Sequence, residues 1–310
     1  KRSKSALSRR QASGPRVGWR QMSDNNTSSA PKQNVLAFGG GVDSTCLLAM
    51  HLNRNEAANI LGITRDDLDE ALPNFDAVVF SDTGAEFAKT YENIETAREL
   101  CKEAGLHFEV VRKEGETITE WVTRLGIVPV MAGGPHVCSV KFKGDVMAAW
   151  AADEFGSSES VRWSIGIEFD EGHRVTRFKQ KGKTDSIFPL VTLEITRAKA
   201  AAIIAACWPH EVVKSSCVFC PFMSEGEIEN LTKCDAEFEI AKKVEARFEE
   251  ASKVKHQAFV DGGRKLNKGG RANKGQWRKD SFAEGARLFV KKINGRQLSI
   301  SEWADRVAKS

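Results

Sequence analysis

Two stretches of this sequence hold residue types that can do chemistry. The first is FGGGVDST, residues 38–45, in which three consecutive glycines precede an aspartate, a serine and a threonine. Glycine lets a backbone approach a phosphate closely, and the N–H groups that open a helix bind anions. The second is a set of four cysteines, Cys207, Cys217, Cys220 and Cys234, whose central C-x-x-C pair is spaced to reach one metal ion.

The glycine stretch lies between an apolar run at 34–38 and a helical pattern from Ser44 to about Asn53. A strand, a glycine turn and a helix start together form a common phosphate site, although a tight turn without a ligand is the alternative. Neither G-x-x-x-x-G-K-[ST] nor G-x-G-x-x-G occurs here, so two familiar glycine loops are excluded. We therefore predict that a phosphate is bound by Phe38, Gly39, Gly40, Gly41, Asp43, Ser44 and Thr45.

This stretch resembles the pyrophosphate loop (PP-loop), SGGxDS, of the adenine nucleotide α-hydrolase superfamily, with Gly39 in place of the first serine. A second segment, SDTGAEFAKT at 81–90, resembles the DTGxEFPET segment of the branch that reduces 3′-phosphoadenylyl sulfate (PAPS). The residues that match are Asp82, Thr83, Gly84, Glu86, Phe87 and Thr90. The resemblance implies that the aspartate, threonine, glycine and glutamate of this segment contact the nucleotide. A helix N-cap at Ser81 or Thr83 is the structural alternative.

Two further segments resemble the same family. HVCSVKFKGDV (136–146) is similar to its C-T-x-x-F-K segment through Cys138, Ser139, Phe142 and Lys143, and GIEFDEGHR (166–174) is similar to G-x-x-x-x-E-x-x-R through Glu171 and Arg174. The resemblance implies that Lys143 and Arg174 act with Asp43 and Ser44 as catalytic residues on an anionic substrate. Cys138 is equally well interpreted as a small buried residue.

The sequence around the C-x-x-C pair, SSCVFCPF (215–222), resembles an SGCxFCPF segment of PAPS-reductase-like proteins of phages and bacteria. Related DNA phosphorothioation sulfurtransferases hold a [4Fe–4S] cluster with four cysteines around such a segment. The resemblance implies the ligand set Cys207, Cys217, Cys220 and Cys234, although the family often has a cysteine where Ala200 stands. Zn²⁺, a redox-active C-x-x-C and plain core cysteines are the alternatives.

Composition limits the class of protein. Hydrophobic residues make up 41% and charged residues 28% of the 310 residues, as in a soluble globular chain, and no apolar run reaches the roughly 20 residues that span a bilayer. We expect no membrane partner. Seven unevenly spaced cysteines are a poor disulfide framework and favour a reducing, cytoplasmic location.

Charge is distributed unevenly along the chain. Residues 1–33 carry eight Lys or Arg against one acid, residues 251–310 carry fifteen against five, and the stretch between them is acidic. Basic ends favour a DNA or RNA partner, and tails that only aid solubility are the alternative.

The pattern along the chain predicts an α/β fold with a Rossmann-like open parallel sheet. We expect strands at 34–38, 76–82, 106–112 and 161–167, and helices at 88–104, 117–125, about 139–154 and 235–251. The predicted regions are a disordered basic tail (1–33, of which 1–21 need not be native), a nucleotide-binding domain (34–200), a helical cysteine subdomain (201–250) and a basic extension (251–310). The extension is expected to hold a flexible loop at 261–279 and a short helix at 281–292.

The resemblance implies an enzyme that binds ATP or PAPS with Mg²⁺ and acts at the α-phosphate. We expect an ATP-dependent sulfurtransferase or another nucleic-acid-modifying enzyme, with a sulfur donor protein as a further partner. Reduction of PAPS to release sulfite is the second hypothesis, although the Glu-Cys-Gly-Leu-His segment that this reaction uses is absent from these residues. A non-catalytic nucleotide-binding protein is the third.

Overall fold

Five parallel strands form the central sheet of the computed structural model, which describes residues 32–129, 136–176, 185–262 and 286–309. The strands are β1 (Gln33–Phe38), β2 (Ala77–Asp82), β3 (His107–Arg112), β4 (Val161–Ile165) and β5 (Asp185–Ile187). Their spatial order is β3-β2-β1-β4-β5, and every pairing is parallel. The α/β class and the four expected strands are confirmed. The fifth strand is only three residues long, which is too short to give a periodic signal.

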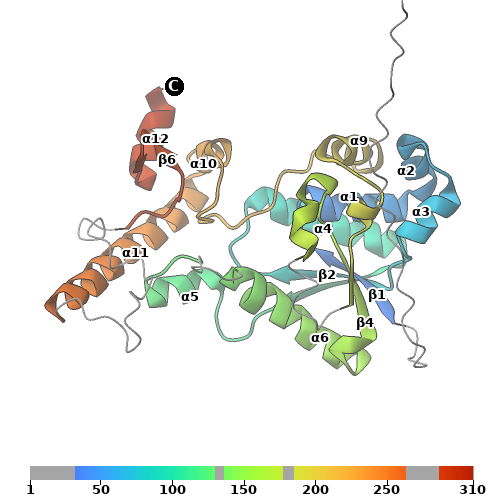
Figure 1. Cartoon of the computed structure of the whole chain (residues 1–310), viewed down its shortest axis with the longest axis horizontal. Helices are drawn as coiled ribbons and strands as arrows, with labels where there is room; N and C mark the ends of the chain where they lie inside the picture. The colour runs from blue at the N-terminus through green and yellow to red at the C-terminus, as the bar shows by residue number, and fades with distance from the viewer. Residues whose placement is uncertain (1–31, 130–135, 177–184, 263–285, 310) are drawn as a thin grey trace, which may run out of the picture. The chain divides into compact units, whose positions relative to one another are not determined.

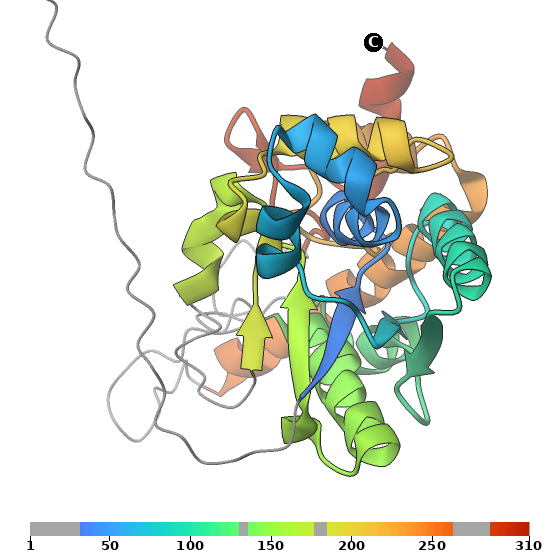
Figure 2. The same ribbon diagram turned by 90° about the vertical axis from the view of Figure 1, so that its right-hand side faces the viewer.

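Alternate residues of each inner strand are buried on opposite faces of the sheet. Val35 and Val79 pack on the side of helix α6, whereas Leu36 and Phe80 pack on the other side with helices α1, α4 and α9. Figures 1 and 2 show these helices on the two sides of the sheet. A parallel sheet covered on both faces explains why these strands read as continuous apolar runs.

The helices of this sheet-containing region are connected by short loops. They are α1 (Val42–Leu52), α2 (Arg54–Leu61), α3 (Arg65–Ala71), α4 (Ala88–Glu103), α5 (Ile118–Leu125), α6 (Asp145–Phe155), α8 (Pro189–Thr192) and α9 (Arg197–Cys207). Helices α3 and α5 begin with reciprocal capping boxes, at Thr64 with Asp67 and at Thr117 with Glu120. The helix expected at about 139–154 begins with a wider π-helical segment, η1 (Cys138–Gly144), which leads into α6. Short 3₁₀ segments, η2 (Ser158–Ser160) and η3 (Phe169–Arg174), flank β4.

The strand order reverses between β1 and β4, and open α/β sheets leave a crevice at the carboxyl ends of the strands at such a point. The loop after β1 is the glycine stretch, and Gly166 follows β4. A Cβ added at Gly166 would lie 2.8 Å from the backbone nitrogen of Ser44, so only glycine allows the two loops to approach so closely. The fold thus places the predicted phosphate loop at the reversal point.

A second hydrophobic core involves the C-terminal third of the chain. Its elements are α5, α10 (Glu225–Leu231), α11 (Asp235–Asp261), the hairpin of β6 (Lys292–Ile293) and β7 (Arg296–Gln297), and α12 (Ile300–Lys309). Phe289 and Trp303 are fully buried in it. The described part of 251–310 is therefore packed protein and not a tail.

The structure also alters two predicted boundaries. Helix α9 packs against α1 and α2 through Ile203 and Ile204, so the division expected at residue 200 cuts a helix that belongs to the sheet's own core. The helix expected at 281–292 is not present over residues 286–292, and the helix of this region is α12. Residues 1–31 and most of the expected loop at 261–279 lie outside the described residues. No helix within the described ranges has the length and apolar character needed to cross a membrane.

Glu245 of α11 joins the C-terminal segment to the second core. Its carboxylate is 4% exposed and accepts hydrogen bonds from the backbone N–H groups of Leu288 and Ile300, each at 2.8 Å. A Glu245→Ala change leaves both buried donors unsatisfied, at about 1–3 kcal/mol each, so the free energy of unfolding should fall by roughly 2–5 kcal/mol in urea titrations. Glu250→Ala, which removes an exposed i,i+3 ion pair with Arg247, is the control and should change it by less than about 0.5 kcal/mol. Equal losses for the two variants would contradict this role of Glu245.

Candidate functional site

The glycine loop makes a tight left-handed turn between β1 and α1. Gly40 has φ +68°, and a Cβ at this position would lie 2.8 Å from Cγ2 of Thr90. The N–H of Gly39 donates to Oγ of Ser44 at 3.0 Å, and the Ser44 hydroxyl donates to the carbonyl of Gly41 at 3.2 Å. Gly41 is the N-cap of α1 and supplies no side-chain cap, so N–H groups of the first helical turn have no capping side chain.

A buried amide holds this loop from α4. The side chain of Asn93 donates to the carbonyl of Gly40 and to Oγ1 of Thr45, both at 2.9 Å, and accepts from Nε1 of Trp208 at 2.8 Å. Asn93 is 2% exposed, which makes these hydrogen bonds difficult to replace with water. Sequence reasoning missed both Asn93 and Trp208.

Ser215, in the segment before the C-x-x-C pair, lies against the glycine loop. A Cβ at Gly41 would lie 2.6 Å from Oγ of Ser215 and 3.0 Å from its backbone nitrogen, and a Cβ at Gly39 would lie 3.9 Å from the same Oγ. The buried hydroxyl of the next residue, Ser216, has no hydrogen-bond partner in the described part of the chain. The Ser215 hydroxyl, from a distant part of the chain, thus comes to a loop that lacks one serine of the PP-loop pattern.

Charged side chains surround the start of α1. Arg197, the first residue of α9, lies 2.9 Å from the carboxylate of Asp43 and 2.9 Å from that of Glu168. Burial raises the pKa of Asp43, Arg197 opposes that rise, and the nearby carboxylates of Glu168 and Glu171 add to it. Arg174 pairs with Glu171 and also lies close enough to Asp43 to lower its pKa. The structure therefore places Arg174 near enough to Asp43 to influence its pKa, and it adds Arg197 and Glu168, which were not among the predicted site residues.

The turn after β2 is stabilised by its own polar side chains. Asp82 is 3% exposed, and its Oδ1 accepts from the N–H of Gly84 at 2.7 Å and from the hydroxyl of Tyr91 at 2.9 Å. Its other oxygen pairs with Arg112. The hydroxyl of Thr83 donates to Oε1 of Glu86 at 3.2 Å. The hydrogen bonds of Asp82 and Thr83 thus build the turn itself.

The N-cap alternative for this turn is not observed. The N-cap residue of α4 is Phe87, which has no capping side chain, and the hydroxyl of Ser81 donates instead to the carbonyl of Phe142 at 2.7 Å. Phe38, at the end of β1, is also a core residue, since its ring is 3% exposed and meets Phe108 edge to face.

Lys143 lies beside this turn and not beside the glycine loop. Its Nζ is 3.2 Å from Oε1 of Glu86, whose side chain is buried. Burial lowers the pKa of Lys143, but its interactions with Glu86, Cys138 and Cys217 together outweigh this effect, so the pKa is raised and the ammonium charge is kept. Oε2 of Glu86 is buried and has no hydrogen-bond partner in the part of the chain that the structure describes. This lysine therefore belongs to a second group, which also includes the thiols of Cys138 and Cys217.

The four predicted metal ligands are not brought together. Cys207 ends α9 and packs with the core beneath α1, where it interacts with Cys46. Cys217 and Cys220 are in the second core with Cys138. Cys234 is the exposed N-cap of α11 and interacts with Glu237. The described residues include no group of three or more His, Cys, Asp or Glu side chains arranged to hold a metal ion. Binding of a [4Fe–4S] cluster or of Zn²⁺ by the predicted set stays a prediction.

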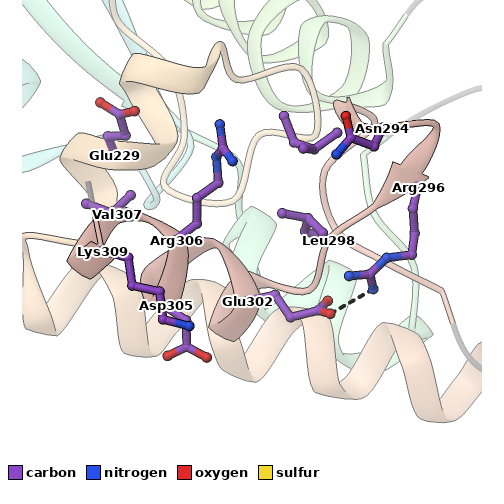
Figure 3. A pocket seen from close by; sticks show the side chains of 10 residues that line it. Glu229, Asn294, Arg296, Leu298, Glu302, Asp305, Arg306, Val307 and Lys309 are labelled. Atoms are coloured by element: carbon purple, nitrogen blue, oxygen red, sulfur yellow. Dashed lines mark hydrogen bonds and ion pairs between the residues drawn. The ribbon is translucent and has the colours of Figure 1, made fainter.

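Two cavities lie away from the glycine loop. One, of about 780 Å³, is lined by α10, the β6–β7 hairpin and α12, where Arg296 pairs with Glu302 at 2.7 Å (Figure 3). The other, of about 580 Å³, lies beside the end of β3 and includes Trp150. Three basic and three acidic side chains line the second cavity: Arg112, Lys113, Lys141, Glu114, Asp145 and Asp153. Neither cavity has the net positive charge expected of a nucleic-acid site.

Neither a scan against models of protein families nor a search of curated proteins found a match to this chain. The assignment of chemistry to the site thus depends on its geometry and on the sequence motifs.

The conformation of Gly40 leads to a test of the loop. Gly40→Ala forces a side chain into the left-handed region, which costs about 1–2 kcal/mol, and pushes it against Thr90. The free energy of unfolding should fall by at least this amount in denaturant titrations. Gly39→Ala is the matched control, because the nearest atom to its Cβ would be at 3.7 Å and its φ is not in the left-handed region. If the two variants are equally stable, the described conformation of the loop is wrong.

Proposed function

We propose that this protein is a PP-loop enzyme that binds an adenine nucleotide at the glycine loop and acts at its α-phosphate. The observation that carries the proposal is the position of the loop at the strand-order reversal, where open α/β sheets bind their ligands. Support also comes from the donors that converge there. The backbone N–H groups between Gly40 and Ser44 and the hydroxyl of Ser215 lie within this small region, while the N–H groups of Gly39 and Thr45 and the hydroxyl of Ser44 donate within the loop itself.

In this proposal, the N–H groups of the loop bind the β- and γ-phosphates, helped by the dipole of α1. Arg174 and Arg197 lie next to Asp43 at the start of the helix and can turn to an incoming anion. Mg²⁺ would enter with the nucleotide, held mainly by phosphate oxygens and by one carboxylate, for which Asp43 is the candidate. Lys143, which lies with Glu86, is assigned to the part of the substrate that extends toward the turn after β2.

The reaction that fits this arrangement is transfer of the adenylyl group. An oxygen of the acceptor attacks the α-phosphorus, the bond to pyrophosphate breaks, and the acceptor is adenylated. The loop donors would stabilise the charge that develops on the leaving pyrophosphate. We further propose that the acceptor is a nucleic acid, bound through the basic ends of the sequence, and that a sulfur donor protein completes sulfur transfer to it.

The test is turnover of ATP labelled in its α-phosphate, with and without added DNA or tRNA. Wild-type protein should release pyrophosphate and form AMP or adenylated nucleic acid. Arg174→Gln and Arg197→Gln should each slow this reaction by roughly tenfold to a hundredfold, because each removes one cation from the phosphate-binding region. Arg65→Gln is the control, since its ion pair with Asp69 lies in α3. Release of sulfite from PAPS with a thiol reductant, without ATP turnover, would favour the reductase hypothesis, and binding without turnover would favour an accessory protein.

Ser215 gives a second and more specific prediction. If its hydroxyl replaces that of the serine missing at Gly39, Ser215→Ala should weaken ATP binding by roughly threefold to tenfold, the value of one hydrogen bond. Adding Gly39→Ser in the same chain should restore affinity, because a Cβ at Gly39 has room, with Ser44 Oγ at 3.7 Å. Calorimetric titration measures both. Ser157 lies before β4, at the amino ends of the strands and so away from the glycine loop, and Ser157→Ala is the control that should leave ATP affinity unchanged.

A double variant that binds no better than Ser215→Ala would show that the two positions are not equivalent. A wild-type protein with no affinity for ATP, AMP or PAPS would contradict the proposed function as a whole.

A further inference from the structure

Cys217 and Cys220 occupy the two ends of a tight turn. The N–H of Cys220 donates to the carbonyl of Cys217 at 2.9 Å, which is the hydrogen bond that closes a four-residue turn. Such a turn brings its first and last Cα atoms to within about 7 Å, and disulfides join cysteines whose Cα atoms are about 4.4–6.8 Å apart. The backbone therefore already holds these two residues at disulfide distance, whereas Cys207 and Cys234 lie elsewhere.

Contacts with the turn after β2 fix the position of this pair. Cys217 forms an isolated antiparallel bridge with Glu86, and the N–H of Val218 donates to the carbonyl of Ala85 at 2.8 Å. The sides of the turn differ in packing, since Val218 and Phe219 are buried while both cysteines are partly exposed. The backbone contacts hold the two cysteines of this turn in a fixed position relative to each other.

The two sulfurs are also unequal. The thiol of Cys217 donates a hydrogen bond to the sulfur of Cys220, and the N–H of Phe222 donates to the same sulfur. Both bonds lower the pKa of Cys220, while the bond between the two thiols and burial raise the pKa of Cys217. Lys214 adds a positive charge nearby. Cys220 is thus the better nucleophile, and Cys217 is placed to react with it afterwards.

We propose that Cys217 and Cys220 are a redox-active dithiol that is oxidised reversibly to an intramolecular disulfide by small disulfides of the glutathione class. The Cys220 thiolate attacks one sulfur of the small disulfide, forms a mixed disulfide and expels one thiolate. Cys217 then loses its proton to solvent, attacks the Cys220 sulfur and expels the second thiolate. The protein loses two electrons and two protons, and the small disulfide becomes two thiols. This site does not depend on nucleotide binding.

Cys138 is the third thiol of the neighbourhood, since it interacts with Cys220 and Cys217. It belongs to η1, far along the chain from the turn, and no turn hydrogen bond joins it to either cysteine in the described part of the chain. We therefore assign the disulfide to the pair within the turn.

The experiment treats the full-length protein with oxidised glutathione near neutral pH and maps disulfides by mass spectrometry. Wild-type protein should lose the mass of two hydrogens and yield a Cys217–Cys220 disulfide that dithiothreitol reverses. Cys217→Ser should stop at a glutathione adduct on Cys220. Cys220→Ser should react at least tenfold more slowly, since the hydrogen-bonded thiolate is lost. Cys138→Ser is the matched control and should form the wild-type disulfide at the wild-type rate.

Three results would overturn the proposal. The first is wild-type protein in which both cysteines stay reduced under conditions that oxidise free dithiols. The second is a disulfide that joins Cys138 to either residue in place of the turn pair. The third is iron or zinc bound to wild-type protein in stoichiometric amount and lost in both Cys217→Ser and Cys220→Ser, which would restore a metal centre.

Discussion

The side chain of Asn93 is the interaction on which the site most depends. One amide joins three elements, because it binds the carbonyl of Gly40, the hydroxyl of Thr45 and the indole of Trp208 in a region closed to water. A left-handed glycine turn has little intrinsic preference for one geometry, so its conformation must be imposed by neighbours. Here α4 and the end of α9 impose it together. The direction in which the N–H groups of the loop point therefore depends on α4 and α9 as well as on the loop itself.

Features formed by neighbouring residues could be predicted from the sequence, whereas features formed by contacts between distant residues could not. The strands were predictable because both faces of the sheet are buried, which leaves apolar runs such as 35–38 and 77–80. The glycine loop was predictable because its residues are consecutive. Asn93 was not, since one polar residue on the buried face of a helix looks like an interruption of the pattern. Ser215 was not, because its contact with Gly41 joins segments more than a hundred residues apart.

The ligand set of four cysteines shows the limit of spacing as evidence. Only nine residues lie between Cys207 and Cys217, but Cys207 ends a helix that faces α1, and the chain then crosses toward the turn after β2. Spacing in sequence gives the largest possible separation of two residues and says nothing of the core into which each is packed. The C-terminal region was misread for a related reason. The basic residues between 263 and 285 dominate its composition, and they hide the short apolar clusters around Phe289 and Trp303 that build a core.

The segment from Ser215 to Cys220 connects the two groups of candidate functional residues. At its start, Ser215 packs against Gly41 of the glycine loop, and two residues later Cys217 pairs with Glu86, which in turn holds Lys143. An extended chain covers only about 3.3–3.6 Å per residue, so a shift of the cysteine turn has little slack before it reaches Ser215. The proposed dithiol and the proposed phosphate site therefore lie close together along the chain, because only one residue separates Ser215 from Cys217. Each site still depends on its own contacts, and neither requires the other.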